Sequence, residues 1–188
     1  MRYPNGKTTN SISYKSRGAS LEKDLNLTNK YYADKGIAFI YKKPTPIKLV
    51  KVDYPSKNNI VSKIIIKEAY FEMPSTTDYN GLYKGKYIDF EAKETASKTS
   101  FPISNIHKHQ LNHLRNIINN GGIGFIIVRF TSLNKTFILM GKDLFNYLDN
   151  SLKKSIPYDY FLKQGHLIKE GYLPRLDYLE IIKNIMEE

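Results

Sequence analysis

The segment from Pro74 to Lys93, which reads PSTTDYNGLYKGKYIDFEAK, includes two carboxylates and a lysine that could act together. Asp78 comes first, and a short predicted strand later in the segment carries Glu91 and Lys93. Successive side chains of a strand point to opposite faces, so Glu91 and Lys93 lie side by side on one face. Carboxylates are hard oxygen ligands for a divalent metal ion, and a nearby cation can orient a water or offset developing charge. These residue types indicate a site for hydrolysis of a phosphodiester.

Turn signals between the two acidic residues predict a hairpin. Asn80-Gly81 and Lys84-Gly85-Lys86 are both rich in the residues that tight turns require, and a chain that folds back there brings Asp78 close to Glu91. Asp89 lies on the same strand face as Glu91. It is a second-tier candidate for the site, and an ion pair or simple solvation is its alternative role.

A polar residue interrupts the apolar face of the helix expected next. Ser104 can cap this helix, which ends at Gly121-Gly122. Gln110 lies on its apolar stripe, four residues from both Ile106 and Leu114. A buried amide needs a partner, and a metal-bound water or the metal itself would be one. A backbone group is the other, and it is the commoner partner for a single glutamine.

Three histidines also occur on this helix. His109 and His113 have the i, i+4 spacing of a zinc-binding face, but the acidic residue of the metalloprotease pattern is absent between them. A structural or solvated role is therefore favoured for these two residues and for His107. The glycines at 121, 122 and 124 follow a helix and lack a Gly-Lys-Ser/Thr ending, so they form a turn and not a phosphate loop.

Hydrophobic patterning over the remaining chain predicts an α/β domain with a mixed sheet. Residues 123–130 form a near-continuous apolar run, which is typical of a central strand buried on both faces. We expect a single domain over residues 18–188. The other predicted elements are helices at about 20–35, 143–148 and 177–188, and strands at 37–41, 47–52, 60–66 and 136–140.

Lysines are concentrated in a segment at about 41–71, where two β segments are joined by a polar loop. This pattern predicts a protruding two-stranded stalk that suits a nucleic-acid backbone. Without the rest of the chain, a hairpin that uses lysine to prevent edge-to-edge aggregation is the favoured alternative. The lysines concerned are Lys42, Lys43, Lys48, Lys51, Lys57, Lys63 and Lys67.

Residues 1–17 are polar, basic and without periodicity, and they predict a flexible arm. Contact with DNA, for example through Arg17, and plain terminal disorder are equally good interpretations of this arm.

The charge of the chain points to a polyanionic partner. The 188 residues include 29 Lys plus Arg against 18 Asp plus Glu, a net charge of +11. Binding to a polyanion such as DNA should therefore weaken steeply with salt. An anionic membrane surface also fits the charge, but the sequence has no apolar run of 18 residues and no signal peptide at its start. We expect a cytoplasmic protein, and the absence of cysteine suits a reducing compartment.

The spacing Asp, spacer, Glu-x-Lys is the signature of the nuclease fold best known from restriction endonucleases. Four longer segments resemble the RecU family of Holliday junction resolvases much more specifically. They are RYPNGK at 2–7, NKYYADKGIAFIYKKPTPIKLVKVDYP at 29–55, IKEAYFEMPSTTDYNGLYKGKYIDFEAKETASKTSFP at 66–102, and GYLPRLDY at 171–178.

This resemblance implies a restriction-endonuclease-like nuclease core with a protruding β stalk. It also implies magnesium-dependent cutting of four-way DNA junctions by paired symmetric nicks, with Mn²⁺ as a substitute ion. Its implied partners are a second copy of the chain, junction DNA, and recombinase and branch-migration proteins, with no membrane. The implied metal ligands are Thr76, Asp78, Glu91 and Gln110, and Lys93 would stabilise the transition state.

Two other functions remain open from the sequence. One is a restriction-type or phage-type nuclease that acts on linear duplex DNA. The other is a junction-binding or architectural protein whose carboxylates are only structural. Cleavage of a junction in magnesium, compared with binding in EDTA, separates these possibilities.

Overall fold

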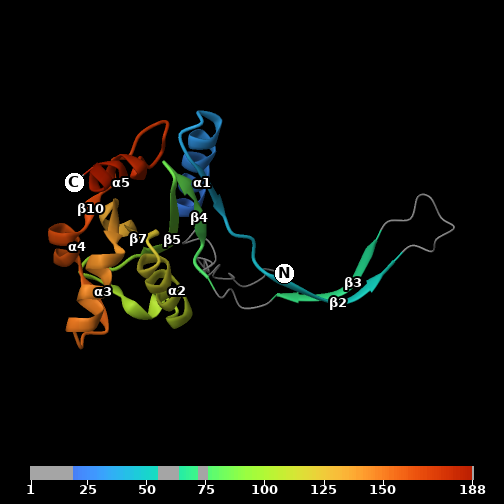
Figure 1. Ribbon diagram of the computed structural model, residues 1–188. Coiled ribbons are helices and arrows are strands. Elements are labelled where there is room, and N and C mark those ends of the chain that lie inside the picture. Colours follow the sequence, from blue (N-terminus) through green and yellow to red (C-terminus); the bar gives the residue numbers. More distant parts are fainter. Residues whose placement is uncertain (1–18, 55–63, 72–75, 188) are drawn as a thin grey trace, which may run out of the picture.

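The computed structural model describes residues 19–54, 64–71 and 76–187 (Figure 1). Predictions that concern the arm, Arg17, Lys57 and Lys63 lie outside these residues. The elements are, in order, α1 (Ala19–Asp34), β1 (Phe39–Lys42), β2 (Ile47–Asp53), β3 (Ile65–Phe71), β4 (Tyr79–Tyr83), β5 (Lys86–Thr95), β6 (Ser100–Pro102), η2 (Ile103–Asn105), α2 (Lys108–Asn119), β7 (Ile123–Phe130), η3 (Thr131–Leu133), β8 (Lys135–Met140), α3 (Gly141–Asn150), β9 (Ser155–Pro157), α4 (Tyr158–Gln164), β10 (His166–Leu167) and α5 (Tyr178–Glu187).

A six-stranded sheet in the order β1-β4-β5-β7-β8-β10 forms the centre of the body. β5 and β7 are parallel, and the other neighbouring strands are antiparallel. The parallel pair needs a crossover connection, and α2 lies within it. The predicted mixed sheet is therefore confirmed, with β5 and β7 in the middle.

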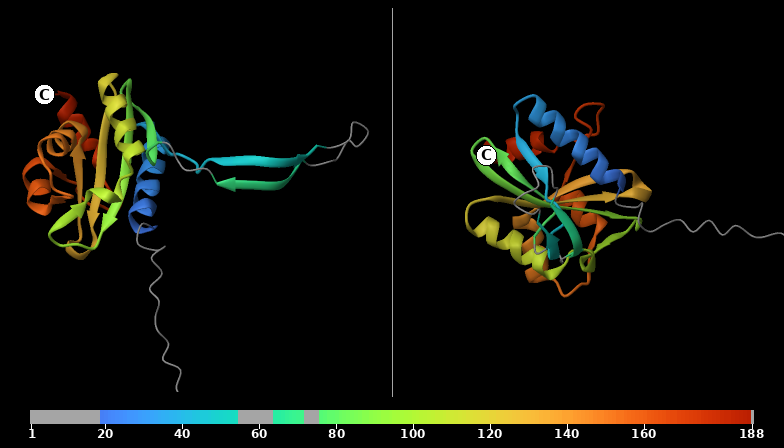
Figure 2. Two further views of the ribbon diagram at one scale, coloured as in Figure 1. Left: turned by 90° about the horizontal axis from the view of Figure 1, so that it is seen from below. Right: turned by 90° about the vertical axis from the view of Figure 1, so that its right-hand side faces the viewer.

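Helices cover both faces of this sheet (Figures 1 and 2). Phe125 and Ile127 of β7 belong to the core that includes α1 and α5, whereas Ile126 and Val128 belong to the core that includes α2, α3 and α4. The alternation follows from the two-residue period of a strand, and it explains why β7 is apolar along nearly its whole length.

A two-stranded ribbon of β2 and β3 extends away from the body (Figures 1 and 2). Its strands pair antiparallel from Ile47 opposite Phe71 to Asp53 opposite Ile65. Every residue of β3 is exposed. This ribbon is the described part of the predicted stalk. The observed second strand begins later than the predicted one, whose first residues are not described, and it continues to Phe71.

The hairpin of β4 and β5 turns at only one of the two positions that the sequence predicted. Lys84 and Gly85 both have positive φ values, 45° and 75°, as a tight two-residue hairpin loop requires. Asn80 and Gly81 lie within β4, so the turn predicted there is wrong. Gly81 lies so close to β1 that a Cβ atom on it would be 2.0 Å from the carbonyl oxygen of Phe39. This glycine permits a close approach of strands.

The start of the next helix also differs from the prediction. Ser104 lies in the short η2 segment, and α2 begins at Lys108 with His107 at its N-cap position. The backbone N–H of His107 donates to Oε1 of Gln110 at 2.9 Å, a contact that closes the first turn without a serine cap. Among the described helices, none has the length and apolar character needed to cross a membrane.

Candidate active site

The β4–β5 hairpin places Asp78 beside Glu91. Asp78 directly precedes β4, and the pairing of Tyr79 with Phe90 brings the two acidic residues to the same end of the hairpin. The backbone N–H of Asp78 donates to Oε2 of Glu91 at 3.1 Å. The backbone N–H of Ala92 donates in turn to Oδ2 of Asp78 at 3.3 Å. The proximity predicted for the two carboxylates is confirmed.

Glu91 is fully buried, and other side chains contact its second oxygen. Gln110 of α2 donates its amide nitrogen to Oε1 of Glu91 at 2.8 Å, and Lys93 donates to the same oxygen. The polar residue on the apolar stripe of α2 thus has a carboxylate as its partner. The shared face of Glu91 and Lys93 is also as predicted.

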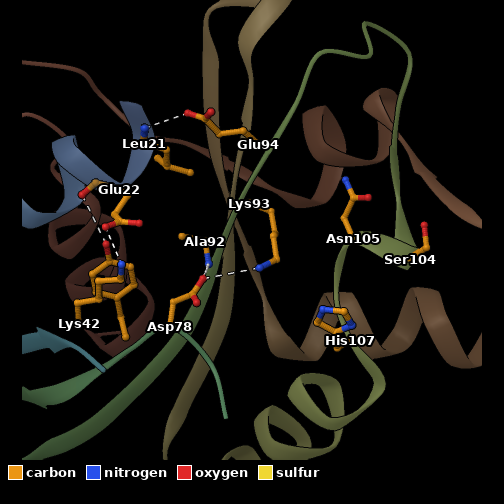
Figure 3. Close-up of a pocket in the computed structure, with 11 residues that line it drawn as sticks. Leu21, Glu22, Lys42, Asp78, Ala92, Lys93, Glu94, Ser104, Asn105 and His107 are labelled. Atoms are coloured by element: carbon orange, nitrogen blue, oxygen red, sulfur yellow. Dashed lines mark hydrogen bonds and ion pairs between the residues drawn. The ribbon is translucent and has the colours of Figure 1, made fainter. Parts of the chain in front are cut away.

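Lys93 lies between the two carboxylates and is 25% exposed, with its amine 3.8 Å from Oδ2 of Asp78. Figure 3 shows this side chain pointing toward Asp78, with His107 and Asn105 on its other side. These residues line a cavity of about 560 Å³, which also includes Glu22. The cavity gives the lysine and Asp78 access to solvent, while Glu91 lies beneath them.

The electrostatic environment of Glu91 favours a bound cation. The pKa of Glu91 is raised to about 7, because burial and the charge of Asp78 raise it more than the charge of Lys93 lowers it. Two carboxylates with partial neutralisation by one amine leave excess negative charge in a buried place. A divalent cation would stabilise the ionised form of Glu91, so the donor set fits such an ion.

The remaining ligands would be neutral oxygens. Among residues 19–54, 64–71 and 76–187, no group of three or more His, Cys, Asp or Glu side chains could hold a metal ion. Thr76 is half-buried and lies two residues before Asp78. Gln110 presents its nitrogen to Glu91, because its oxygen accepts the N–H of His107. Ligation through that oxygen therefore requires a half-turn of the amide.

A second buried carboxylate, Asp89, lies two residues before Glu91 on the same strand face. Its side chain is fully buried and contacts four other side chains. The contacts are with the Lys43 amine, the Thr77 hydroxyl, the Tyr87 hydroxyl and the His113 ring. The solvation considered for Asp89 from the sequence does not occur, whereas the ion pair does. We call these five residues the Asp89 cluster.

The three histidines of α2 have different partners, which argues against a zinc-binding pair. His113 contacts Asp89 at 3.1 Å, and the rings of His107 and His109 stack with their centroids 5.3 Å apart. The cavity-lining position of His107 was missed in the sequence, because no spacing rule connects a helix cap to the strand beside it. His113, three residues after Gln110, has a detectable signal, since this spacing places both on one helix face.

The predicted DNA-binding lysines fall into two groups. Lys42 and Lys43 lie at the end of β1 in the body, where Lys42 lines the cavity and pairs with Glu22 at 2.6 Å. Lys43 does not belong to the stalk surface, because its amine is held by Asp89 and Thr77. The others that are described lie on the ribbon, and they are Lys48, Lys51 and Lys67, the last paired with Asp53.

A mixed sheet that presents two carboxylates and a lysine from one hairpin, with an amide from the adjoining helix, defines an α/β protein of the nuclease class. The chain belongs to the family described as RecU, Recombination protein U, whose model matches residues 16–184. The family assignment made from the four sequence segments is therefore confirmed.

Curated relatives match over almost their whole length. A protein of Geobacillus sp. (strain WCH70) named Holliday junction resolvase RecU is 48% identical, with 98% of this chain and 96% of the relative covered. A protein of the same name from Bacillus thuringiensis (strain Al Hakam) is 46% identical, with 98% of each chain covered. The structure of the Archaeoglobus fulgidus Holliday junction resolvase Hjc matches with a TM-score of 0.43 and 10% identity, covering 80% of this chain and 95% of that one.

Proposed function

We propose that this protein is a metal-dependent endonuclease that resolves four-way DNA junctions by paired symmetric nicks during recombination and repair. The observation that carries the proposal is the convergence of Asp78, Glu91 and Lys93, the first and last of which line one cavity, in a member of the RecU family. The names of its relatives support the choice of a four-way junction as substrate.

Asp78 and Glu91 would hold Mg²⁺ or Mn²⁺, with Thr76 and Gln110 as neutral donors. A bound divalent ion polarises a phosphate oxygen and lowers the pKa of water. Lys93 has two roles that follow from its position. Its charge helps keep Glu91 ionised, and its partly exposed amine can orient the attacking water or offset charge on the phosphate.

The charge and shape of the chain support a junction as the preferred DNA. The net charge is +11, and the ribbon of β2 and β3 extends from the body with exposed Lys48 and Lys51. Such a ribbon can reach backbone phosphates of a four-way junction that a linear duplex would not present together. A two-fold dimer would supply two equivalent sites, as paired nicks require.

The cellular setting of the proposal follows from the same activity. The protein would act on DNA in the cytoplasm, together with recombinase and branch-migration proteins that form and move the junction. The arm at residues 1–17 would add a basic DNA contact through Arg17. A single nuclease domain over residues 18–188 would carry the activity.

One assay tests the function directly. The purified protein is incubated with a labelled mobile four-way junction, or with its component duplexes, in EDTA, Mg²⁺ or Mn²⁺. We expect junction binding in EDTA, and symmetric nicks in the junction alone when a divalent metal is added. Binding without cleavage in either metal would instead identify a junction-binding protein. Equal cleavage of the component duplexes would identify a nuclease of broader specificity.

A further inference from the structure

The Asp89 cluster joins three parts of the molecule that are far apart in the sequence. Lys43 follows β1 and begins the connection to β2, and its amine lies 2.8 Å from Oδ2 of Asp89. Thr77 lies between Thr76 and Asp78, and its hydroxyl bonds to Asp89. His113 comes from α2, the helix that also carries Gln110. A single buried carboxylate thus contacts the base of the stalk, the metal-ligand segment and the ligand-bearing helix.

Lys43 also bonds directly to the segment that contains Thr77 and Asp78. The Lys43 amine also donates to the Thr77 hydroxyl at 2.9 Å. The backbone N–H of Lys43 donates to the carbonyl oxygen of Asp78 at 2.8 Å. Residues 77 and 78 are therefore held by Lys43 through both side-chain and main-chain bonds. A change in the direction of the chain at Lys43 would move the main chain of Asp78.

The burial of the cluster indicates that these bonds are well maintained. Asp89 is fully buried, Thr77 is 2% exposed, and the Lys43 side chain is 18% exposed. A buried charge without a partner is strongly destabilising, so Asp89 holds its donors in place wherever the fold is intact. Tyr87, at 38%, and the His113 side chain, at 23%, are more exposed, so Asp89, Thr77 and Lys43 form the least exposed part of the cluster.

We propose that Asp89, Lys43 and Thr77 are positioning residues that fix the metal-ligand segment 76–78 relative to the base of the stalk. Movement of the stalk on a bound junction is thereby coupled to the geometry of the metal site. This inference rests on the proposed nuclease function. The cluster acts through Asp78 and Thr76, and it does not itself contact the metal or the DNA.

The substitution Thr77→Val tests the proposal, because it keeps the shape of the side chain and removes only its hydroxyl. Substitution of a group that orients metal ligands typically weakens metal affinity by about 10- to 100-fold. We therefore expect Thr77→Val to need at least about tenfold more Mn²⁺ for half-maximal junction cleavage. Junction binding in EDTA should remain at the wild-type level.

A second readout does not depend on activity. Mn²⁺ that binds the folded protein raises the Tm, so a titration without DNA reports metal affinity. Thr77→Val should require a similarly higher Mn²⁺ concentration for the same rise in Tm. Thr77→Ser retains the hydroxyl and should behave like the wild type. Thr28→Val removes a fully buried hydroxyl that accepts the backbone N–H of Leu176 and does not line the cavity, and it should lower the Tm without changing the metal requirement.

Lys43→Met provides an independent variant at the base of the stalk, outside the metal-ligand segment. It should also raise the Mn²⁺ requirement, and the effects of Lys43→Met and Thr77→Val should be non-additive in the double variant.

An unchanged metal requirement in both single variants overturns the inference. Equal shifts in Thr77→Val and Thr28→Val overturn it too, since they would show a loss of stability alone. Absence of cleavage by the wild type would contradict the proposed function, and the Mn²⁺ melting titration would still test the positioning role.

Discussion

Gln110 donates its amide nitrogen to Glu91 at 2.8 Å and accepts the backbone N–H of His107 through its amide oxygen at 2.9 Å. One side chain therefore completes the first turn of α2 and satisfies a fully buried carboxylate. The backbone partner suggested by the sequence is present, whereas the other contact is with a carboxylate and not with the suggested metal or metal-bound water. The buried amide is explained without a metal, so its role as a ligand remains a proposal.

Replacing Gln110 by Met should weaken both the fold and the metal site. The variant keeps a side chain of similar length but leaves Glu91 without one donor and the His107 N–H without its acceptor. A hydrogen bond to a charged group contributes about 1.5 to 3 kcal/mol, so the metal-free free energy of unfolding at pH 8 should fall by about that amount. Urea unfolding measures the loss, and a titration with Mn²⁺ should show weaker binding.

Asn112→Met is the matched control, because Asn112 is an exposed amide on the same helix. It should leave both stability and metal affinity near the wild-type values. If Gln110→Met unfolds at the wild-type urea concentration, the two hydrogen bonds contribute nothing measurable. An unchanged Mn²⁺ affinity would remove Gln110 from the proposed ligand set.

Lys93→Ala should lower the cleavage rate by about 10²-fold or more, while junction binding in EDTA changes little. Lys93 is the amine that contacts both Asp78 and Glu91. Its loss removes the partly exposed amine that can orient the attacking water or offset charge on the phosphate. Single-turnover cleavage at saturating enzyme separates the loss of rate from any loss of binding.

Lys98→Ala removes an equal charge from an exposed position in the loop after β5, and serves as the comparison. It should cut at nearly the wild-type rate. Wild-type nicking by Lys93→Ala would show that the assignment of this lysine is wrong.

Local sequence patterns were sufficient to predict the hairpin and its carboxylates. The two-residue period of β5 predicted that Glu91 and Lys93 share a face, and the Gly at position 85 predicted the turn that brings Asp78 back to them. The apolar run of β7 predicted a strand buried on both faces. Each of these inferences depends on residues close together in the chain.

Contacts between distant segments could not be predicted in this way. The ion pair of Lys43 with Asp89 joins residues 46 positions apart, and a lysine in a lysine-rich segment gives no sign that it will pair with a buried carboxylate. Gly81 was interpreted as a turn residue, because the approach of β1 that requires it is a tertiary contact. Such features depend on which strands become neighbours in the sheet.

The raised pKa of Glu91 predicts a pH-dependent stability in the absence of metal. Its folded-state value is about 7, above the ordinary 4.5, so ionisation opposes folding. The associated stability is fully present below pH 4.5 and is lost as the pH rises through 7. A shift of this size corresponds to about 3 kcal/mol between pH 4 and pH 8. Urea unfolding at a series of pH values measures the slope.

Glu91→Gln should flatten this slope, because it removes the titrating group. The slope is the appropriate comparison, since an amide cannot accept hydrogen bonds at both of its terminal atoms as the carboxylate does. Mn²⁺ binding by the wild type should strengthen as the pH rises toward 7 and then level off, because the metal competes with a proton. Identical slopes in wild type and variant would contradict the assigned pKa.

The stalk predicts a specific salt dependence of junction binding. Each lysine that contacts a phosphate contributes about one unit to the slope of log K against log salt. Lys48→Ala and Lys51→Ala should each reduce that slope by about one unit in EDTA. Lys30→Ala, an exposed lysine of α1 paired with Asp34, should leave it unchanged. Equal slopes for all three variants would show that the ribbon lysines do not contact the junction.

Gly81→Ala should destabilise the sheet at the edge that supports the site. A Cβ atom there would be 2.0 Å from the carbonyl oxygen of Phe39 and 2.5 Å from Cα of Ile40, so β1 must move away from β4. Forced overpacking of this kind costs about 1 to 3 kcal/mol, which urea unfolding of the metal-free protein measures. Because Lys42 ends β1 and Lys43 follows it, the same shift should raise the Mn²⁺ requirement.

Gly85→Ala is the control, with a φ of +75° but nothing within 4 Å of its Cβ, and it should cost about 1 kcal/mol with no change in metal affinity. If Gly81→Ala is no less stable than Gly85→Ala, the close approach of β1 does not constrain this edge of the sheet.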